Sequence, residues 1–178
     1  IDPLAVLEML GKQDELQYYW EHPEDRLAIA AGETLHQLST SGPNRFENMS
    51  ALIEAEKQHV FEYSALRHSL AGVHFLGGFS FSDDESNPDW KQFGGSTFVL
   101  PRWTFIRDGE LCMLTINAEA GPEMTSSILR RNVEERIQQT SGILIDYSHA
   151  ALERSRRKAA ASAHIIEEPG SLHRWIRN

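Results

Sequence analysis

The sequence is poor in three features that define whole classes of protein: cysteine, long apolar runs and positive charge. A single cysteine, Cys112, excludes a disulfide within the 178 residues, and its place inside an expected strand favours a buried, unreactive thiol. No apolar run approaches the roughly 20 residues that a helix needs to cross a bilayer, and no charged-then-apolar leader is present. We therefore expect a cytoplasmic protein.

The net charge of −9 sets limits on the partners. Asp and Glu outnumber Lys and Arg by 26 to 17, which disfavours nonspecific binding to nucleic acid or to an anionic membrane. The densest basic cluster, Arg154 to Lys158, lies in an Ala-rich stretch with little apolar patterning. We interpret this stretch, residues 148–164, as an exposed helix or a linker, and we expect no nucleic acid and no membrane as a partner.

Motifs for catalysis and for metal binding are also missing. No two of the eight histidines have the spacing of a helical zinc pair, and the carboxylate cluster Asp83-Asp84-Glu85 lacks the ligand alternation of a calcium loop. The glycine pairs Gly77-Gly78 and Gly94-Gly95 fit no phosphate-binding pattern and indicate bulges or close backbone contacts. The sequence predicts no catalytic residue and no metal ligand in this chain, and it leaves substrate-binding residues unknown.

What the sequence does contain is a run rich in aromatic and β-branched residues, from Gly77 to Asn117. This run predicts three strands, one ending at Phe81, one over residues 97–106 and one over residues 110–117. The last two strands form a hairpin in which Asp108-Gly109 supplies the two positive-φ positions of a tight turn.

The first 40 residues and the segment before Phe81 predict further strands. Residues 16–23 and 26–31 form a pair, Gly32-Glu33 interrupts the pattern, and residues 34–40 form another strand. A strand resumes at Val73, and residues 164–169 are a candidate for a short final one.

Three helices complete the pattern. The first begins at Pro3 with Asp2 as its cap and ends at Gly11. The second begins at Asn44, which forms a capping pair with Glu47, and runs to about residue 66, and the third covers about residues 123–140. Each helix has apolar positions that share one face and are expected to face the core. They are Leu4, Leu7 and Leu10 in the first helix, Phe46, Met49, Ile53 and Val60 in the second, and Met124, Ile128, Leu129, Val133 and Ile137 in the third. The charged residues of the third helix form a solvated face: Arg130, Arg131, Glu134, Glu135 and Arg136.

These elements predict an α+β fold with a largely antiparallel sheet flanked by helices, in one domain over residues 1–178. The first residue, Ile1, and the aromatic Trp175 near the end indicate that the chain is cut from a longer one, with residues 165–178 beginning a further region. A sheet that is cut leaves unpaired edges and apolar faces, so we expect the isolated chain to pair with a copy of itself.

The order of the strand motifs resembles the amino-terminal half of isochorismate synthases, which are chorismate-binding enzymes of menaquinone or salicylate-type pathways. The resemblance covers about residues 16–117 and resumes at Glu168-Pro169 with Trp175. The motifs that carry it are residues 18–23 (YYWEHP), 41–46 (SGPNRF) and 77–81 (GGFSF), Trp90 with Phe93, and residues 98–103 (FVLPRW) followed by 114–117 (LTIN). At Gly94-Gly95-Ser96 the chain departs from the family, which more often has a proline and a small residue after the phenylalanine.

The resemblance implies that the chemistry belongs to another part of the polypeptide. In the family, the lysine that activates water, the acid that helps expel the chorismate hydroxyl and the glutamates that hold magnesium belong to the carboxy-terminal region. This chain is then the non-catalytic half of a magnesium-dependent isomerase, and its partner is the carboxy-terminal chorismate-binding half of the same polypeptide.

Two alternatives remain open at this point. The chain is a stand-alone binding or regulatory module, or it is the amino-terminal half of another chorismate-utilising enzyme, such as a salicylate or anthranilate synthase. The Leu-Leu-Glu-Ser stretch that often marks the inhibitor site of anthranilate synthases does not occur here.

Overall fold

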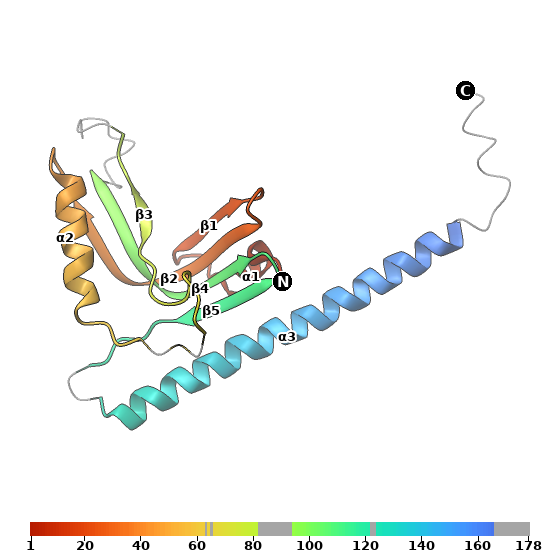
Figure 1. Cartoon of the computed structure of the whole chain (residues 1–178). Coiled ribbons are helices and arrows are strands. Elements are labelled where there is room, and N and C mark those ends of the chain that lie inside the picture. Colours follow the sequence, from red (N-terminus) through yellow and green to blue (C-terminus); the bar gives the residue numbers. More distant parts are fainter. Residues whose placement is uncertain (63, 65, 82–93, 122–123, 166–178) are drawn as a thin grey trace. The chain divides into compact units, whose positions relative to one another are not determined.

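A computed structural model describes residues 1–62, 64, 66–81, 94–121 and 124–165. The chain divides into two compact units, residues 1–137 and 138–178, and the last helix belongs to both. The fold is α+β, as the sequence predicted. The elements in chain order are α1 (Pro3–Leu10), β1 (Gln17–His22), β2 (Leu27–Thr40), α2 (Arg45–Lys57), β3 (Leu76–Phe79), β4 (Ser96–Asp108), β5 (Leu111–Ile116) and α3 (Ser126–Ile165) (Figure 1).

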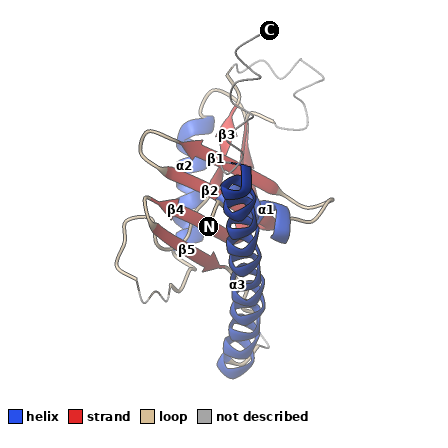
Figure 2. Ribbon diagram, turned by 90° about the vertical axis from the view of Figure 1, so that its right-hand side faces the viewer, coloured by secondary structure: helices blue, strands red, loops and turns tan. Residues whose placement is uncertain are grey.

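The five strands form one antiparallel sheet in the order β1-β2-β4-β3, and β5 also pairs with β4 (Figure 2). Since β2 occupies one side of β4, the strands β3 and β5 share the other side. Asn117 lies at the break between them, where its backbone N–H donates to the Arg102 carbonyl at 2.8 Å and its side chain donates to the Pro101 carbonyl at 2.7 Å. Most of β4 is therefore hydrogen-bonded on both sides.

Small residues of β2 lie beside large residues of β4. The register places Ala28 beside Arg107, Ala30 beside Phe105 and Gly32 beside Trp103. A Cβ atom on Gly32 would lie 2.5 Å from Cζ2 of Trp103, and the Trp103 side chain is almost fully buried at 3% exposure. The missing side chain at residue 32 is what lets the indole lie against the sheet.

The strand β2 corrects one prediction, because Gly32-Glu33 does not interrupt it. The strand runs unbroken through both residues, and its register against β4 shifts between Thr34 and His36, which is a β-bulge. Glu33 has a φ of +58°. Pro101 pairs with Thr34 at the same place, where an irregular ladder tolerates a residue that has no N–H to donate.

The β4–β5 hairpin is confirmed, but its turn is not the predicted one. Asp108 pairs with Leu111, so the two turn residues are Gly109 and Glu110, and the positive φ in this turn, +58°, belongs to Gly109. A glycine with positive φ at the first turn position is the pattern of a type II′ turn, whereas the prediction placed Asp108 and Gly109 in a type I′ turn.

Helix α1 has the predicted ends and a different buried face. The Asp2 carboxylate accepts the N–H of Leu4 at 3.0 Å, Pro3 is the first helical residue, and Gly11 follows the last turn. Pro3, Val6 and Leu7 are buried, whereas Leu4 is 44% exposed. The buried residues have the i, i+3, i+4 spacing of one helix face, and the predicted set of leucines was wrong at Leu4.

Helices α2 and α3 differ from their predicted lengths. Helix α2 ends at Lys57, where His59 Nδ1 lies 3.0 Å from the Ala55 carbonyl, and the Asn44 side chain makes no capping hydrogen bond. Helix α3 continues past Thr140 to Ile165, because a single glycine, Gly142, costs only about 1 kcal/mol in a helix.

The predicted inward faces of these two helices are also wrong in part. Met49 is buried as expected, but Phe46 is 50% exposed, and Ile128 and Ile137 are each more than 40% exposed. Within the described part of the chain, no helix has an apolar stretch of the length that a membrane crossing requires. Several predictions lie outside the described residues: those for Asp83-Asp84-Glu85, Trp90, Phe93 and residues 166–169 of the final strand. The first two residues of that strand, His164 and Ile165, belong to α3 instead.

Glycine at residue 77 is required by a close backbone contact, which confirms the structural role predicted for this pair. A Cβ atom there would lie 2.1 Å from the Thr97 carbonyl oxygen and 2.6 Å from the Phe98 Cα, and both atoms are backbone. The neighbouring Gly78 has open space where a Cβ would be.

We expect Gly77→Ala to lower the free energy of unfolding by about 1–3 kcal/mol, because β4 must shift to admit the methyl group. Gly78→Ala is the matched control and changes it by less than about 0.5 kcal/mol. Urea denaturation followed by tryptophan fluorescence measures both. Equal stability of the two variants would contradict the close contact of β3 with β4.

Candidate functional site

Two of the strand motifs are joined by one buried arginine. Arg45, from residues 41–46, donates from Nη1 to the Gly42 carbonyl at 3.3 Å and from Nη2 to the Ser80 carbonyl at 3.1 Å. The Phe46 and Phe79 rings lie 4.5 Å apart, and Phe79 lies 5.1 Å from Phe98. We call these three rings the aromatic cluster. The motifs at residues 41–46 and 77–81 therefore hold α2 against β3 and β4, which is a structural role.

Next to the bulge in β2, a carboxylate lies between two cations from distant parts of the chain. Glu33 is 8% exposed, and its side chain lies 3.1 Å from Lys12 Nζ and accepts a hydrogen bond from Arg136 Nη2 at 2.9 Å. We call Lys12, Glu33 and Arg136 the Glu33 cluster. It joins the loop after α1, strand β2 and the first part of α3. The prediction had placed Arg136 on a solvated face, and this ion pair corrects it.

The pKa of Glu33 reflects two opposed effects. Burial alone would raise it, because a carboxylate is less stable away from water, but the hydrogen bonds from Lys12 and Arg136 outweigh burial and hold the pKa below its ordinary value. Glu33 is therefore ionised at neutral pH. The positive φ adds a conformational cost that these contacts have to offset.

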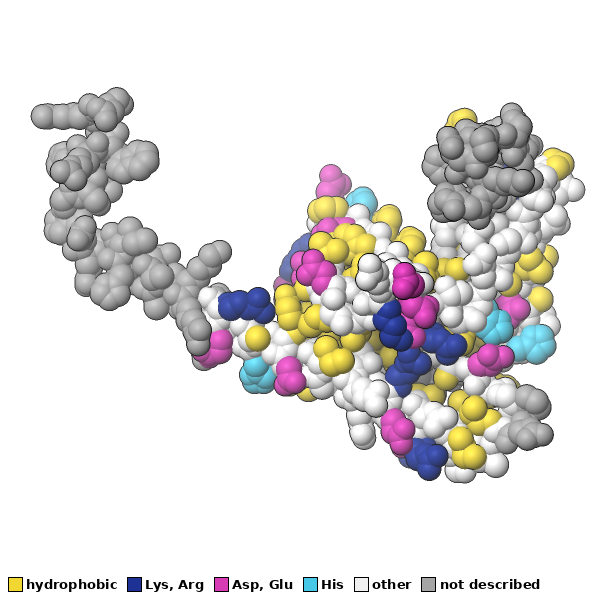
Figure 3. Space-filling view, turned by 180° about the vertical axis from the view of Figure 1, so that it is seen from behind, with side chains coloured by type: hydrophobic (Ala, Val, Ile, Leu, Met, Phe, Trp, Pro, Cys, Tyr) yellow, Lys and Arg dark blue, Asp and Glu magenta, His cyan; other side chains and the backbone are white. Residues whose placement is uncertain are grey.

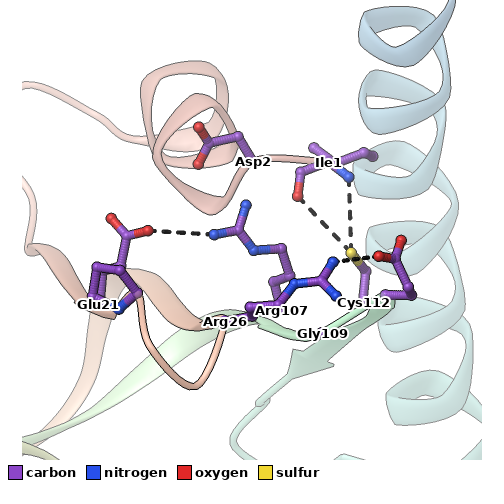
Figure 4. A pocket seen from close by; sticks show the side chains of 9 residues that line it. Ile1, Asp2, Glu21, Arg26, Arg107, Gly109 and Cys112 are labelled. Carbon is purple, nitrogen blue, oxygen red and sulfur yellow. Dashed lines mark hydrogen bonds and ion pairs between the residues drawn. The ribbon is translucent and has the colours of Figure 1, made fainter.

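A pocket of about 470 Å³ lies beside the turn of the β4–β5 hairpin, and we call it the hairpin pocket (Figure 4). Glu21, Arg107 and Cys112 line it from neighbouring strands, because the register places Glu21 opposite Ala28, Ala28 opposite Arg107 and Arg107 opposite Cys112. Its other lining residues are Ile1, Asp2, Pro23, Arg26, Gly109 and Glu110.

Four charged side chains of the hairpin pocket form two ion pairs. Arg107 Nη2 lies 3.4 Å from Glu21 Oε1, and Arg26 donates to Glu110, which lowers the pKa of that exposed carboxyl. Tyr19 donates to Glu21 at 2.7 Å, and this hydrogen bond, followed by burial, raises the pKa of Tyr19 to about 12. With this raised pKa, the Tyr19 hydroxyl stays protonated near neutral pH and does not transfer its proton.

Cys112 is exposed, which corrects the predicted buried thiol. It lies on β5, whose outer edge pairs with no strand in the described part of the chain. The Cys112 sulfur lies 3.8 Å from the Ile1 nitrogen and 3.9 Å from the Ile1 carbonyl oxygen (Figure 4).

A second pocket, of about 310 Å³, lies between the middle of β4, the end of β5 and the first turns of α3, and we call it the helix pocket. Arg102, Asn132 and Arg136 supply its donors, and Glu119 is its acidic group. Its apolar walls are Ile116, Ala118, Met124, Leu129 and Val133. The sequence did not single out this set, because Arg102 and Arg136 are 34 positions apart and line one pocket only in the folded chain.

No group of three or more His, Cys, Asp or Glu side chains is placed to hold a metal ion in residues 1–62, 64, 66–81, 94–121 and 124–165. On the face seen in Figure 3, Lys and Arg side chains gather near the middle beside Asp and Glu, and hydrophobic side chains are exposed around them. Among the described side chains, the helix pocket brings two arginines together, and we identify no acid–base pair.

Comparison with known proteins gives a family for the chain. The family model described as "Chorismate binding enzyme" matches residues 1–170. The isochorismate synthase MenF of Bacillus subtilis (strain 168) is 27% identical over 124 residues, which cover 66% of this chain and 26% of that protein. The chain thus spans about a quarter of the length of this curated relative. No solved structure matches.

The Glu33 cluster gives a test by pH. Because its folded-state pKa is lowered, Glu33 stabilises the fold above its unfolded pKa of about 4.5, and this contribution is lost as the pH falls through the folded value. We expect Glu33→Gln to lower the free energy of unfolding by about 1–3 kcal/mol at pH 7, and the difference from the unmodified chain to shrink below pH 4.5.

The matched control is Glu110→Gln, which removes an exposed ion pair of the hairpin and should leave stability nearly unchanged. Urea denaturation between pH 3.5 and 8 measures all three proteins. A pH-independent loss in Glu33→Gln would contradict the role of its charge.

Proposed function

The chain belongs to the chorismate-binding enzymes, and we propose that it is the amino-terminal region of an isochorismate synthase, which converts chorismate to isochorismate. One observation carries the proposal: the family match extends over residues 1–170. The similarity to an isochorismate synthase supports the choice of reaction within the family. We further propose menaquinone synthesis as the pathway and the cytoplasm as the location.

We propose that this region supports the fold and that the carboxy-terminal region carries the chemistry. In isomerising chorismate, the enzyme moves a hydroxyl group, which requires a base to activate water and an acid to help the hydroxyl leave. The described residues do not fit the magnesium ion that the family implies, since none of their carboxylates gather into a metal site. We therefore assign this chain no step that involves the metal.

The activity itself is tested by comparing two forms of the protein. The 178-residue chain with chorismate and Mg²⁺ should form no isochorismate above the enzyme-free rate. The polypeptide that continues through the carboxy-terminal chorismate-binding region should form it, and EDTA should abolish this activity. Turnover by the 178-residue chain would contradict the division of roles, and inactivity of the longer protein would contradict the reaction.

We propose that the aromatic cluster is the surface on which the carboxy-terminal region of the same polypeptide docks. Phe46 is 50% exposed and Phe79 is 40% exposed, and β3 offers an edge that pairs with no further strand among the described residues. Exposed aromatic surface and an open strand edge are both unfavourable in water, and they are relieved when another part of the polypeptide covers them. The relative's greater length supports an occupant of this kind.

Self-association of the isolated chain tests this surface. We expect light scattering to show dimers or larger species at high concentration, and Phe46→Asp to reduce them. Leu4→Asp is the matched control, because Leu4 is similarly exposed on α1, at another part of the sheet (Figure 1). A monomeric chain, or equal effects of the two variants, would contradict the proposal.

A further inference from the structure

We propose that the helix pocket binds a small carboxylate that has an apolar body. This proposal goes beyond the proposed function and does not rest on it. The pocket lies within the first unit, between the middle of β4, the end of β5 and the first turns of α3. Its volume of about 310 Å³ lies at the lower end of the range of about 300–1,000 Å³ for small-molecule sites.

The pocket has one arginine with no partner in the described part of the chain. Arg102 is half-buried and forms no hydrogen bond or ion pair there through its side chain. A guanidinium group carries five N–H donors and stays charged at any physiological pH. Withdrawing it partly from water without a partner is unfavourable, so an anionic ligand at this position would be stabilised.

The second arginine, Arg136, is held in place by Glu33 and still has N–H donors available for a ligand. Arg136 Nη2 donates to Glu33, and Lys12 shares the same carboxylate. Lys12 neutralises much of the Glu33 charge. The ion pair with Glu33 therefore fixes the position of Arg136 without cancelling all of its positive charge. Among the residues that line the pocket, Arg102 and Arg136 oppose one acidic group, Glu119, in a chain whose net charge is −9.

The remaining walls determine which kind of anion fits. Ile116, Leu129 and Val133 form an apolar surface beside the cationic groups, and the Asn132 amide adds one further polar contact. A bare phosphate would leave this apolar surface wet, whereas a ring that carries one carboxylate covers it and meets the arginines with its charged end. The pocket therefore favours a cyclic or aromatic monocarboxylate.

The proposal is tested with benzoate as the probe, by NMR or calorimetric titration of the 178-residue chain. We expect saturable binding in the millimolar range, and inorganic phosphate should bind at least about tenfold more weakly. Arg102→Gln should weaken benzoate binding roughly tenfold or more. Val133→Thr keeps the shape of the wall but adds a hydroxyl group, so it should weaken benzoate without affecting phosphate.

Arg131→Gln is the matched control. Arg131 is also an arginine of α3, but its side chain is 69% exposed and it pairs with Glu135 outside the pocket. This variant should bind benzoate as the unmodified chain does. Absence of saturable benzoate binding, phosphate binding as tight as benzoate binding, or equal losses in Arg102→Gln and Arg131→Gln would each overturn the proposal. None of these outcomes bears on whether the longer protein isomerises chorismate.

Discussion

The pairing of β2 with β4 is the contact on which the rest of the structure depends. These two strands share a ladder from Leu27 and Asp108 to Thr40 and Ser96, and every other strand pairs with one of them. The ladder joins residues far apart in the sequence, so its formation costs loop-closure entropy that packing has to offset. Small residues of β2 beside large residues of β4 supply that packing, and Gly32 leaves no room for a side chain against Trp103.

The same ladder produces the Glu33 cluster and the helix pocket. The register shift between Thr34 and His36 comes directly after Glu33, which adopts a positive φ and has a largely buried carboxylate. A buried charge is tolerated only when it is paired, and Lys12 and Arg136 meet this requirement from two other segments. Because Arg136 also lines the helix pocket, the fold and the proposed ligand site share one side chain.

Two of the motifs by which the chain resembles its family, residues 41–46 and 77–81, hold neighbouring elements of the fold together. Arg45 connects the turn before α2 with the end of β3, and the aromatic cluster packs beside it. Family membership and the absence of a gathered catalytic set in the described part of the chain are thus compatible, since the motifs concern packing. The chemistry that we propose for the full enzyme then belongs to the carboxy-terminal region.

The sequence by itself determined the α+β class, the ends of α1 and the β4–β5 hairpin, because these follow from patterns among neighbouring residues. It also indicated a bulge or a close backbone contact at Gly77, but the residues in contact, Thr97 and Phe98, belong to another strand. Asp2, Pro3 and Gly11 act on one helix, and the strand pattern around Gly109 acts on one turn. Only the tertiary structure decided the continuity of β2 through Glu33, the exposure of Cys112 and the pairing of Arg136. These features depend on which distant segment packs next to each residue. A local sequence pattern does not predict a contact between residues about one hundred positions apart, as between Glu33 and Arg136.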